Sequence, residues 1–361
     1  MGTTERINRL RRRMQEENLD AFFGTSPENR QYLSGFTGSA GYLFITPSSA
    51  MLATDFRYTE QAGIQSPSYE VMRISGSLEW FKGMASDLGA RRIGFEGSNV
   101  NVNLHQALVK ELRNLRPVPK LVATASMVDE LRAVKEPEEL AMLEHAVFIA
   151  DTAMEQVSQR IRPGMTEKEV AWQMEVAMRE LGADSISFDT IVAAGPNGAR
   201  PHHRAGDYVI QQGDPIVIDM GAKYNGYCSD MTRTFVVGEA DEMFRKVYDI
   251  VLAAQETAEV AVRAGMTGGE TDGLARKIIG DAGYGESFGH SLGHGIGLAV
   301  HEFPRVGPSS TGVIEDGMIF SVEPGIYLTG WGGVRIEDLV VMENGVARVL
   351  NKAHKRDVIA L

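Results

Sequence analysis

Cysteine is nearly absent from this sequence, with a single residue in 361, which excludes an intrachain disulfide framework. Such a composition fits a reducing compartment, and we expect a cytoplasmic protein. Apolar runs are short, and none approaches the roughly 20 residues of a membrane-spanning helix. The basic N-terminal segment has no apolar stretch behind it, so it predicts an amphipathic first helix instead of a signal peptide. Lysine and arginine are fewer than aspartate and glutamate, and the resulting formal net charge of -12 argues against a nucleic-acid backbone as partner.

The length and the 43% content of hydrophobic residues allow a large core and predict two domains. Before about residue 125, short turn-bounded apolar runs predict strands at Ala21–Phe23, Gly41–Thr46, Ala50–Thr54 and Arg92–Glu96. Helical apolar spacing at Ser77–Leu88 and Leu104–Leu115 predicts helices between them, which indicates an α/β domain without evident chemistry. A helical stretch follows, in which Pro137 is well placed to begin a helix. We therefore expect an N-terminal α/β domain over residues 1–126, a linker helix region over 127–140 and a second domain over 141–361.

The second domain repeats itself. The octapeptide RPGMTEKE at Arg162–Glu169 returns as RAGMTGGE at Arg263–Glu270, roughly 100 residues later, and a helical stretch follows each copy. His202 and His301 come next at a similar separation. Because several landmarks recur in the same order, we expect a duplicated fold with halves related by a pseudo-twofold axis. Such an arrangement would bring the ends of both halves to one central cleft.

Each half ends in a hairpin-like segment that carries two acids. The first, GDPIVIDMGAKYNGYCSD, contains Asp219 and Asp230, and the second, GMIFSVEPGIYLTGWGGVRIE, contains Glu323 and Glu337. Acids within apolar strands are costly to bury unless a cation meets them. Four such acids converging on one cleft therefore predict a metal site.

A turn at Lys223–Gly226 would set the register of the first hairpin. In that register Asp219 and Asp230 lie directly opposite each other, with Cβ atoms roughly 4.5–5.5 Å apart. This spacing would let both carboxylates share ions about 3.5–4 Å apart. Cys228 precedes Asp230 by two residues but lacks the context of a catalytic thiolate, so we expect it to pack in the strand.

A fifth ligand is predicted from the glycine-rich segment GHSLGHGIG, which contains His290 and His294. Glycine allows the backbone to approach a crowded metal centre closely. Two divalent ions would neutralise four carboxylates; carboxylate ligation favours Mn(II), and one imidazole makes Co(II) or Zn(II) suitable as well. Two such ions can hold a bridging hydroxide and polarise a carbonyl group, so hydrolysis of an amide or related bond is the expected reaction.

The sequence resembles the pita-bread metallopeptidases, and within them the Xaa-Pro peptidases, which include prolidases (Xaa-Pro dipeptidases) and aminopeptidase P. The motifs VIDMG, YCSDMTRT, HSLGHGIGLAVHE, VEPGIY and GGVRIED occur in the family order, and YLSGFTGSAG and LATDFRYTEQA extend the resemblance to the N-terminal domain. The resemblance implies an α/β (α+β) fold, with a creatinase-like α/β domain followed by a pita-bread catalytic domain. It also implies a homodimer that hydrolyses the Xaa-Pro bond of proline-containing dipeptides or oligopeptides by attack of a metal-bridging hydroxide.

The resemblance also implies a ligand set. Asp219 and Asp230 would bind one ion, and His294 and Glu323 would complete the second. Asp230 and Glu337 would bridge the two ions. Because His294 comes from the second half alone, the two ions should be inequivalent.

Roles in catalysis follow from the same resemblance. His202 would contact the substrate and stabilise the gem-diolate intermediate, His301 would help hold the scissile carbonyl, and His290 would lie near the proline end. Glu323 would take a proton from the bridging water and pass it to the leaving nitrogen, and Arg335 would orient the ligands. A second histidine, His203, stands where many relatives have glycine; we favour His202 as the one that faces the cleft and expect His203 at the surface or behind the site.

Several other functions compete with this interpretation. An aminopeptidase P acting on longer peptides shares all the motifs, and the sequence does not separate it from a dipeptidase. Methionine aminopeptidases share the catalytic fold but usually lack such an N-terminal domain, and creatinase has altered metal positions. A catalytically silent pita-bread scaffold that binds peptides is the alternative of another class, although a scaffold has no need to keep costly buried acids.

Overall fold

The computed structural model describes residues 2–355 and 359–360. The chain divides between Arg132 and Ala133 into two compact units. None of the helices in these described ranges combines the length and the apolar character that crossing a bilayer requires.

The first unit is built on a six-stranded sheet. Its helices are α1 (Thr3–Glu16), α2 (Pro27–Ser34), α3 (Thr59–Gln65), α4 (Glu79–Leu88), α5 (Val102–Leu112) and α6 (Met127–Ala133), and its strands are β1 (Ala21–Gly24), β2 (Tyr42–Ile45), β3 (Ala50–Thr54), β4 (Glu70–Arg73), β5 (Arg92–Glu96) and β6 (Lys120–Thr124). The strand order is β4-β3-β2-β1-β5-β6. β2 runs antiparallel to β1 and β3, and the other neighbours pair in parallel.

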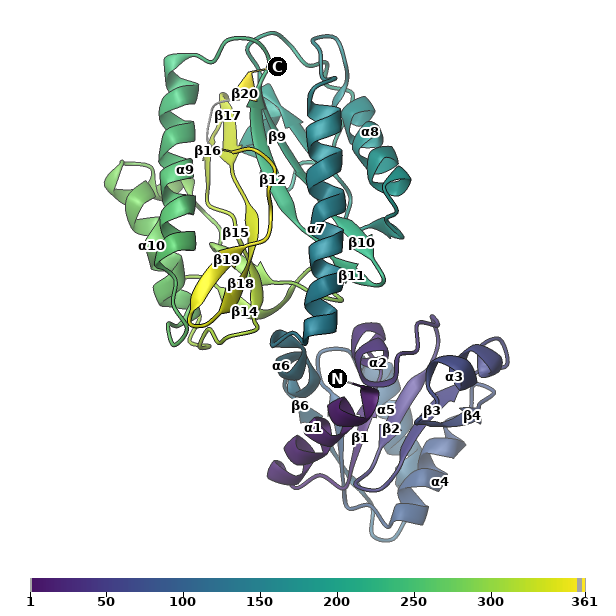
Figure 1. The fold of residues 1–361 in the computed structure, drawn as a ribbon. Coiled ribbons are helices and arrows are strands. Elements are labelled where there is room, and N and C mark those ends of the chain that lie inside the picture. Colours follow the sequence, from purple (N-terminus) through teal and green to yellow (C-terminus); the bar gives the residue numbers. More distant parts are fainter. Residues whose placement is uncertain (1, 356–358, 361) are drawn as a thin grey trace. The chain divides into compact units, whose positions relative to one another are not determined.

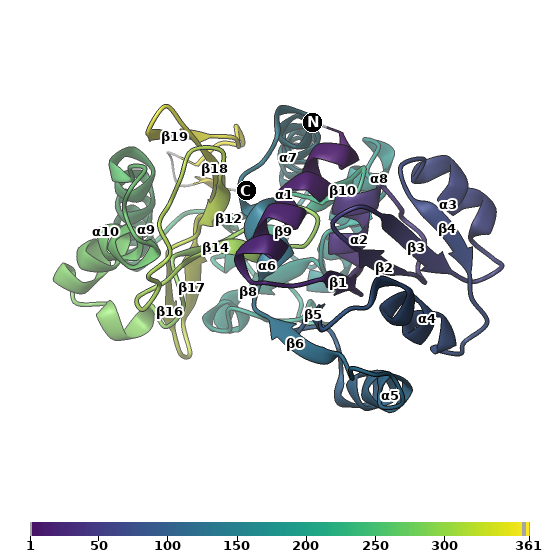
Figure 2. The same ribbon diagram turned by 90° about the horizontal axis from the view of Figure 1, so that it is seen from below.

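Helices cover both faces of this sheet, with α1 and α2 on one face and α4 and α5 on the other (Figure 2). Phe23, Phe44 and Phe81 lie in a buried cluster between the sheet and the second pair of helices. The strands expected from the apolar runs near residues 21, 42, 50 and 92 are confirmed, as are the helices near 79 and 104. β4 and β6 were not predicted, because their burial is partial and their sequences mix charged with apolar residues.

The second unit contains the repeated sequence. Its helices are α7 (Pro137–Ser158), α8 (Glu167–Glu180), η1 (Gly195–Ala199), α9 (Glu242–Ala261), α10 (Gly268–Asp281) and η2 (Gly285–Ser287), and its strands are β7 (Ser185–Ile186), β8 (Ile191–Ala194), β9 (Pro215–Met220), β10 (Ala222–Tyr224), β11 (Tyr227–Cys228), β12 (Met231–Val236), β13 (Gly293–Gly295), β14 (Glu302–Val306), β15 (Ile319–Val322), β16 (Gly325–Leu328), β17 (Gly332–Arg335), β18 (Asp338–Glu343), β19 (Val346–Val349) and β20 (Ile359–Ala360). As predicted, Pro137 begins α7.

The two halves of this unit have the same plan, which confirms the expected fold class. Two helices come first in each half, α7 and α8 or α9 and α10, and in Figure 1 these pairs flank the strands on opposite sides. β8, β9 and β12 then pair antiparallel in that order, as β13, β15 and β18 do in the second half. Each half also has its own buried apolar cluster against its own helix pair.

The repeated octapeptide begins the second helix of each pair. Thr166 and Thr267 are the N-caps of α8 and α10, and each hydroxyl accepts a hydrogen bond from the backbone N–H three residues later. Glu169 and Glu270 complete a capping box by accepting from the N-cap backbone N–H. The repeat is therefore a helix-initiation signal, which satisfies backbone groups that would otherwise lack partners.

Candidate metal centre

The first hairpin carries Asp219 and Asp230 on one face, but not directly opposite each other as predicted. Asn225 and Gly226 form the two-residue turn, both with positive φ, so Tyr224 pairs with Tyr227 and the register is shifted by two residues from the expected one. Asp219 consequently pairs with Thr232. An Asn-Gly turn of this kind matches the twist of the strands better than the assumed one. Because side chains alternate with a period of two, a two-residue shift leaves Asp230 on the same face as Asp219.

The second hairpin carries Glu323 and Glu337. Val322 pairs with Asp338 and Gly325 with Arg335, and both pairs belong to one register, which places the two glutamates directly across from each other. The predicted facing pair of acids is therefore found in the second half and not in the first. A β-bridge between Thr232 and Glu337 joins this hairpin to the first.

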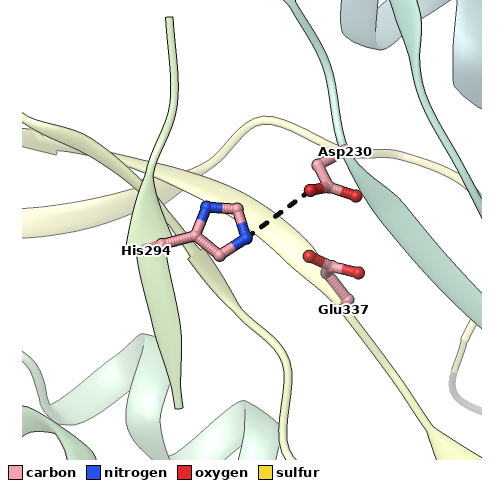
Figure 3. A group of neighbouring side chains, drawn as sticks. All are labelled: Asp230, His294 and Glu337. Atoms are coloured by element: carbon pink, nitrogen blue, oxygen red, sulfur yellow. Dashed lines mark ion pairs between the residues drawn. The ribbon is translucent and has the colours of Figure 1, made fainter. Parts of the chain in front are cut away.

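Three of the predicted ligands form one cluster. Asp230 precedes β12, His294 lies in the middle of β13 and Glu337 precedes β18, so both halves contribute (Figure 3). One ligand atom from each residue lies within 4.8 Å of those of the other two. The imidazole Nε2 of His294 is 3.7 Å from Asp230 Oδ2 and 3.4 Å from Glu323 Oε1. The fourth acid thus borders the same cluster.

The glycines beside His294 allow its strand to fit here. A Cβ on Gly293 would stand 1.9 Å from the carbonyl oxygen of Ser321, and one on Gly295 would stand 2.0 Å from that of Phe303. No side chain is admitted at such distances, so these glycines serve the close approach of neighbouring backbone segments, whereas the sequence had suggested close approach to a metal centre. His294 Nδ1 lies 3.2 Å from Gly295 O, which places the ring proton on Nδ1 and directs the Nε2 lone pair at the acids.

Asp219, the fifth predicted ligand, is held by Arg335. The guanidinium Nη2 is 2.6 Å from Asp219 Oδ2, while Oδ1 is buried and has no hydrogen-bond partner among the described residues. The same guanidinium donates through Nε to Thr232 Oγ1 at 3.0 Å, and this hydroxyl donates to Glu337 Oε2 at 2.6 Å. Arg335 thus contacts one acid of the first half directly and one acid of the second half through Thr232.

The acids are arranged at a high electrostatic cost. Burial, followed by the charges of Glu337 and Asp219, raises the pKa of Asp230 well above its ordinary value. Burial, followed by the charges of Glu323 and Asp219, does the same to the pKa of Glu337, and burial raises the pKa of Glu323 to about 7. Burial also lowers the pKa of His294, which keeps the imidazole neutral. Carboxylates in such a group cannot all be ionised unless cations compensate them.

These residues fit divalent cations. A neutral imidazole whose lone pair faces carboxylates is repelled by them, and the orphaned oxygen of Asp219 has lost its water without gaining a donor. A cation among the four acids and His294 would resolve both conflicts, because all five groups are ligands of divalent ions. Asp219, Asp230, His294, Glu323 and Glu337 are therefore suited to hold metal.

The predicted substrate histidines make different contacts. The rings of His301 and His294 have centroids 4.2 Å apart. His290 Nε2 lies 2.9 Å from the hydroxyl of Tyr327, and burial lowers the pKa of His290 to about 4. His202 is exposed, and it lies near enough to His290 and His301 to interact electrostatically with each ring. His203 instead turns to the buried Glu167, with Nε2 2.8 Å from Oε2.

Two residues of the site were missed at the sequence level. Tyr327 accepts a hydrogen bond from Arg335 Nη1 at 2.9 Å and its hydroxyl lies 2.9 Å from His290 Nε2, so it connects Arg335 to His290. Thr232 carries the link between Arg335 and Glu337. Strand alternation could have found both, since Thr232 follows Asp230 by two residues and Tyr327 follows Glu323 by four. Cys228 is buried and contacts Leu298 O through its thiol at 3.8 Å, as expected for a packed residue.

Known proteins match both units. The family model for the creatinase/prolidase N-terminal domain matches residues 6–134, and that for metallopeptidase family M24 matches residues 141–344. A Xaa-Pro dipeptidase of Pyrococcus furiosus is 38% identical over 96% of this chain and 97% of its own length. The solved structure of a Xaa-Pro dipeptidase from Bacillus anthracis is 41% identical, with full coverage of both chains and a TM-score of 0.96. That of an X-Pro aminopeptidase from Thermotoga maritima is 38% identical, covers 98% of this chain and 99% of that one, and has a TM-score of 0.90. The chain therefore belongs to metallopeptidase family M24, in the branch of pita-bread Xaa-Pro peptidases that carry a creatinase-like N-terminal domain.

Proposed function

We propose that this protein is a Xaa-Pro dipeptidase that uses two divalent metal ions, Mn(II) in the first place and Co(II) or Zn(II) as substitutes. One observation carries the proposal: the acids and His294 converge in a chain that matches named Xaa-Pro dipeptidases over its whole length. Its substrates are proline-containing dipeptides. A cytoplasmic location and a homodimer, as expected from the sequence, belong to the same proposal.

The ligand set divides between the halves. Asp219 and Asp230 would hold one ion, His294 and Glu323 would hold the other, and Asp230 and Glu337 would bridge them. When bound, the ions would lower the pKa of a water molecule and polarise the scissile carbonyl group. Carboxylate predominance in this set is the reason for placing Mn(II) first.

The side chains of the protein then manage protons and orientation. Glu323 borders the cluster, 3.4 Å from His294, and would accept the proton of the attacking water and return it to the leaving proline nitrogen. The C–N bond breaks as that nitrogen gains the proton, which yields a free amino acid and proline. Arg335 keeps Asp219 and Glu337 in position through its direct and Thr232-mediated hydrogen bonds.

The histidines would bind the substrate around this centre. His301, against His294, would hold the scissile carbonyl, and His202 would stabilise the tetrahedral intermediate. His290 would lie at the proline end. The hydrogen-bond chain from Arg335 through Tyr327 to His290 would hold that imidazole in one orientation.

A substrate-length series tests the proposal. Purified protein loaded with Mn(II) is offered Xaa-Pro, Xaa-Pro-Yaa and longer peptides, and the products are identified by mass spectrometry. Release of proline from the dipeptide alone is the expected result. Failure to cleave any Xaa-Pro substrate after loading with Mn(II), Co(II) or Zn(II) would refute a proline-directed peptidase.

An aminopeptidase P activity is the second candidate. The similarity to an X-Pro aminopeptidase of Thermotoga maritima, at 38% identity, favours it nearly as strongly as the dipeptidases favour the first. Cleavage of the longer peptides with release of their N-terminal residue would establish it. A catalytically silent scaffold would instead be recognised by the lack of bound metal and of any metal-induced rise in Tm.

A further inference from the structure

Glu167 is a fully buried carboxylate outside the proposed ligand set. It is the first residue of α8, where the positive end of the helix dipole favours a negative charge. Oε1 accepts hydrogen bonds from Ala194 N at 2.9 Å and from Asn197 Nδ2 at 2.8 Å. Oε2 accepts from Gly206 N at 2.9 Å and lies 2.8 Å from His203 Nε2. Four partners satisfy both oxygens, so the carboxylate is a fixed anchor.

The four partners enclose one loop. Ala194 ends β8, Asn197 lies in η1, and His203 and Gly206 follow, so Glu167 contacts both ends and the middle of segment 194–206. This segment carries His202. We refer to residues 194–206 as the His202 loop.

The His202 loop also meets the strand that leads to the metal ligands. Arg335 Nη1 donates to Pro201 O at 3.4 Å. A Cβ on Gly333 would stand 2.1 Å from Gly198 O, so the loop and β17 are in direct backbone contact. The position of the loop is therefore linked to Arg335, which holds Asp219 and, through Thr232, Glu337.

The second half of the fold lacks this anchor. Gly268 occupies the corresponding place in RAGMTGGE, and a Cβ there would stand 2.1 Å from Arg305 O, so no side chain is admitted. The segment before His301 is held instead by Glu302, whose Oε1 accepts from Ala299 N at 2.8 Å. Each half thus fixes its substrate histidine with a glutamate placed differently, which indicates that the anchor is tied to the histidine and not to the repeated fold.

We propose that Glu167, through its contacts with both ends of the His202 loop and with His203, is a positioning residue that sets His202 against the substrate. The proposal rests on the proposed function, in which His202 contacts the peptide. It also assigns the second histidine of the His202-His203 pair to the anchor.

Hydrogen–deuterium exchange tests the anchor without any substrate. In Glu167→Gln the amide keeps one accepting oxygen and places an NH₂ group where the other oxygen stood, so one backbone N–H of the loop, that of Ala194 or that of Gly206, loses its acceptor. Exchange in residues 194–206 should rise at least about tenfold. Glu180→Gln is the matched control, because it makes the same change at an exposed position at the far end of the same helix, and exchange of the loop should stay unchanged. Equal loop exchange in Glu167→Gln and the unaltered protein would overturn the proposal.

A double-mutant cycle with His202 tests positioning. Glu167→Gln should lower kcat/KM for Xaa-Pro roughly 10- to 100-fold at unchanged metal content. In a His202→Ala background the same change should cost less than about threefold, because the residue through which it acts is gone. Equal losses in both backgrounds would show a merely structural role and overturn the proposal. If the unaltered protein cleaves no Xaa-Pro peptide, the proposed function fails, while the exchange experiment still decides whether Glu167 anchors the loop.

Discussion

The two halves of the second unit share their framework and differ in their chemistry. Both begin a helix with the same capping box and pair their strands in the same order. The first half supplies two aspartates to the centre, and the second supplies two glutamates and His294. The two copies of the repeat therefore share helix initiation and strand pairing, whereas the residues at their strand ends differ.

The acids of the halves also differ in geometry. Glu323 and Glu337 face each other across one register, while Asp219 faces Thr232 and Asp230 is displaced along the strand. The threonine of the first half then donates to Glu337 of the second. One hairpin thus supports a ligand of the other.

The largest expected effect comes from changing Asp230, the acid of the first half that is proposed to bridge the two ions. Asp230→Asn should abolish the binding of both ions and lower turnover at least about 1000-fold, since bound ions contribute several kcal/mol of transition-state stabilisation. Metal content by plasma mass spectrometry and turnover of Xaa-Pro are measured together. Asp207→Asn, an exposed acid of the same half, is the control. A variant at position 230 that keeps both ions and full turnover would show that the bridging assignment is wrong.

Removing the ligand that only the second half supplies should separate the two ions. His294→Ala leaves the aspartates and the bridging glutamate in place, so we expect the metal content to fall from two ions to one for each chain. Calorimetric titration with Mn(II) should show two unequal affinities in the unaltered protein and one in the variant. Loss of both ions, or of neither, would contradict the predicted inequivalence.

Each half uses a buried acid to hold the C-terminal segment, and we expect the two acids to affect the pH dependence of stability differently. Asp151 of α7 accepts from Asn351 Nδ2 at 3.0 Å, and Glu259 of α9 accepts from Lys355 Nζ at 2.8 Å. Burial, followed by the charge of Asp338, raises the pKa of Glu259 to about 8.

The direction in which stability changes with pH follows from proton binding. The folded protein holds the proton of Glu259 more tightly than the unfolded chain does, so this residue's contribution to stability is largest below the unfolded pKa of about 4.3 and is lost as pH rises toward 8. Glu259→Gln should therefore flatten the decline of the free energy of unfolding between these pH values. Urea unfolding at a series of pH values measures it, and parallel curves for the two proteins would show that Glu259 is ionised throughout.

The smallest expected effect tests the shared framework. Thr166→Ala and Thr267→Ala each remove an N-cap hydroxyl from the same capping box, and each should lower the free energy of unfolding by about 1 kcal/mol. Urea unfolding of both variants provides the comparison, with Thr→Ser at each site as the variant that keeps the hydroxyl. A lower free energy of unfolding in one variant and not in the other would show that the two capping boxes do not stabilise the protein equally.

Much of this architecture was readable from the sequence because its signals are local. Pro137 at the start of α7 and the capping boxes need only neighbouring residues. The prediction that Asp219 and Asp230 share one face of the hairpin was correct although the predicted register was wrong, because a shift by two residues leaves side chains on the same face. The register itself failed, since the choice of turn residues around Asn225-Gly226 decides it.

Other features of the site depend on contacts between distant segments. Strand alternation can place Thr232 on the same face as Asp230, but Thr232 lies more than 100 positions before Arg335 and Glu337, so its links to them cannot be read from either hairpin alone. Glu167 sits in the repeat, where its replacement by Gly268 in the second copy was a visible but unused signal. The sequence places His203 beside His202 but does not reveal that His203 contacts the buried Glu167.

The bridge between Thr232 and Glu337 makes the candidate metal centre an interface within one chain. Neither half holds the whole proposed ligand set, so a chain cut between β12 and α9 would yield two pieces that could build the centre only by associating. Ions bound at that junction would favour the associated form by mass action. The free energy of metal binding would then be measurable as affinity between two fragments, in the way that a shared ligand holds the subunits of an oligomer together.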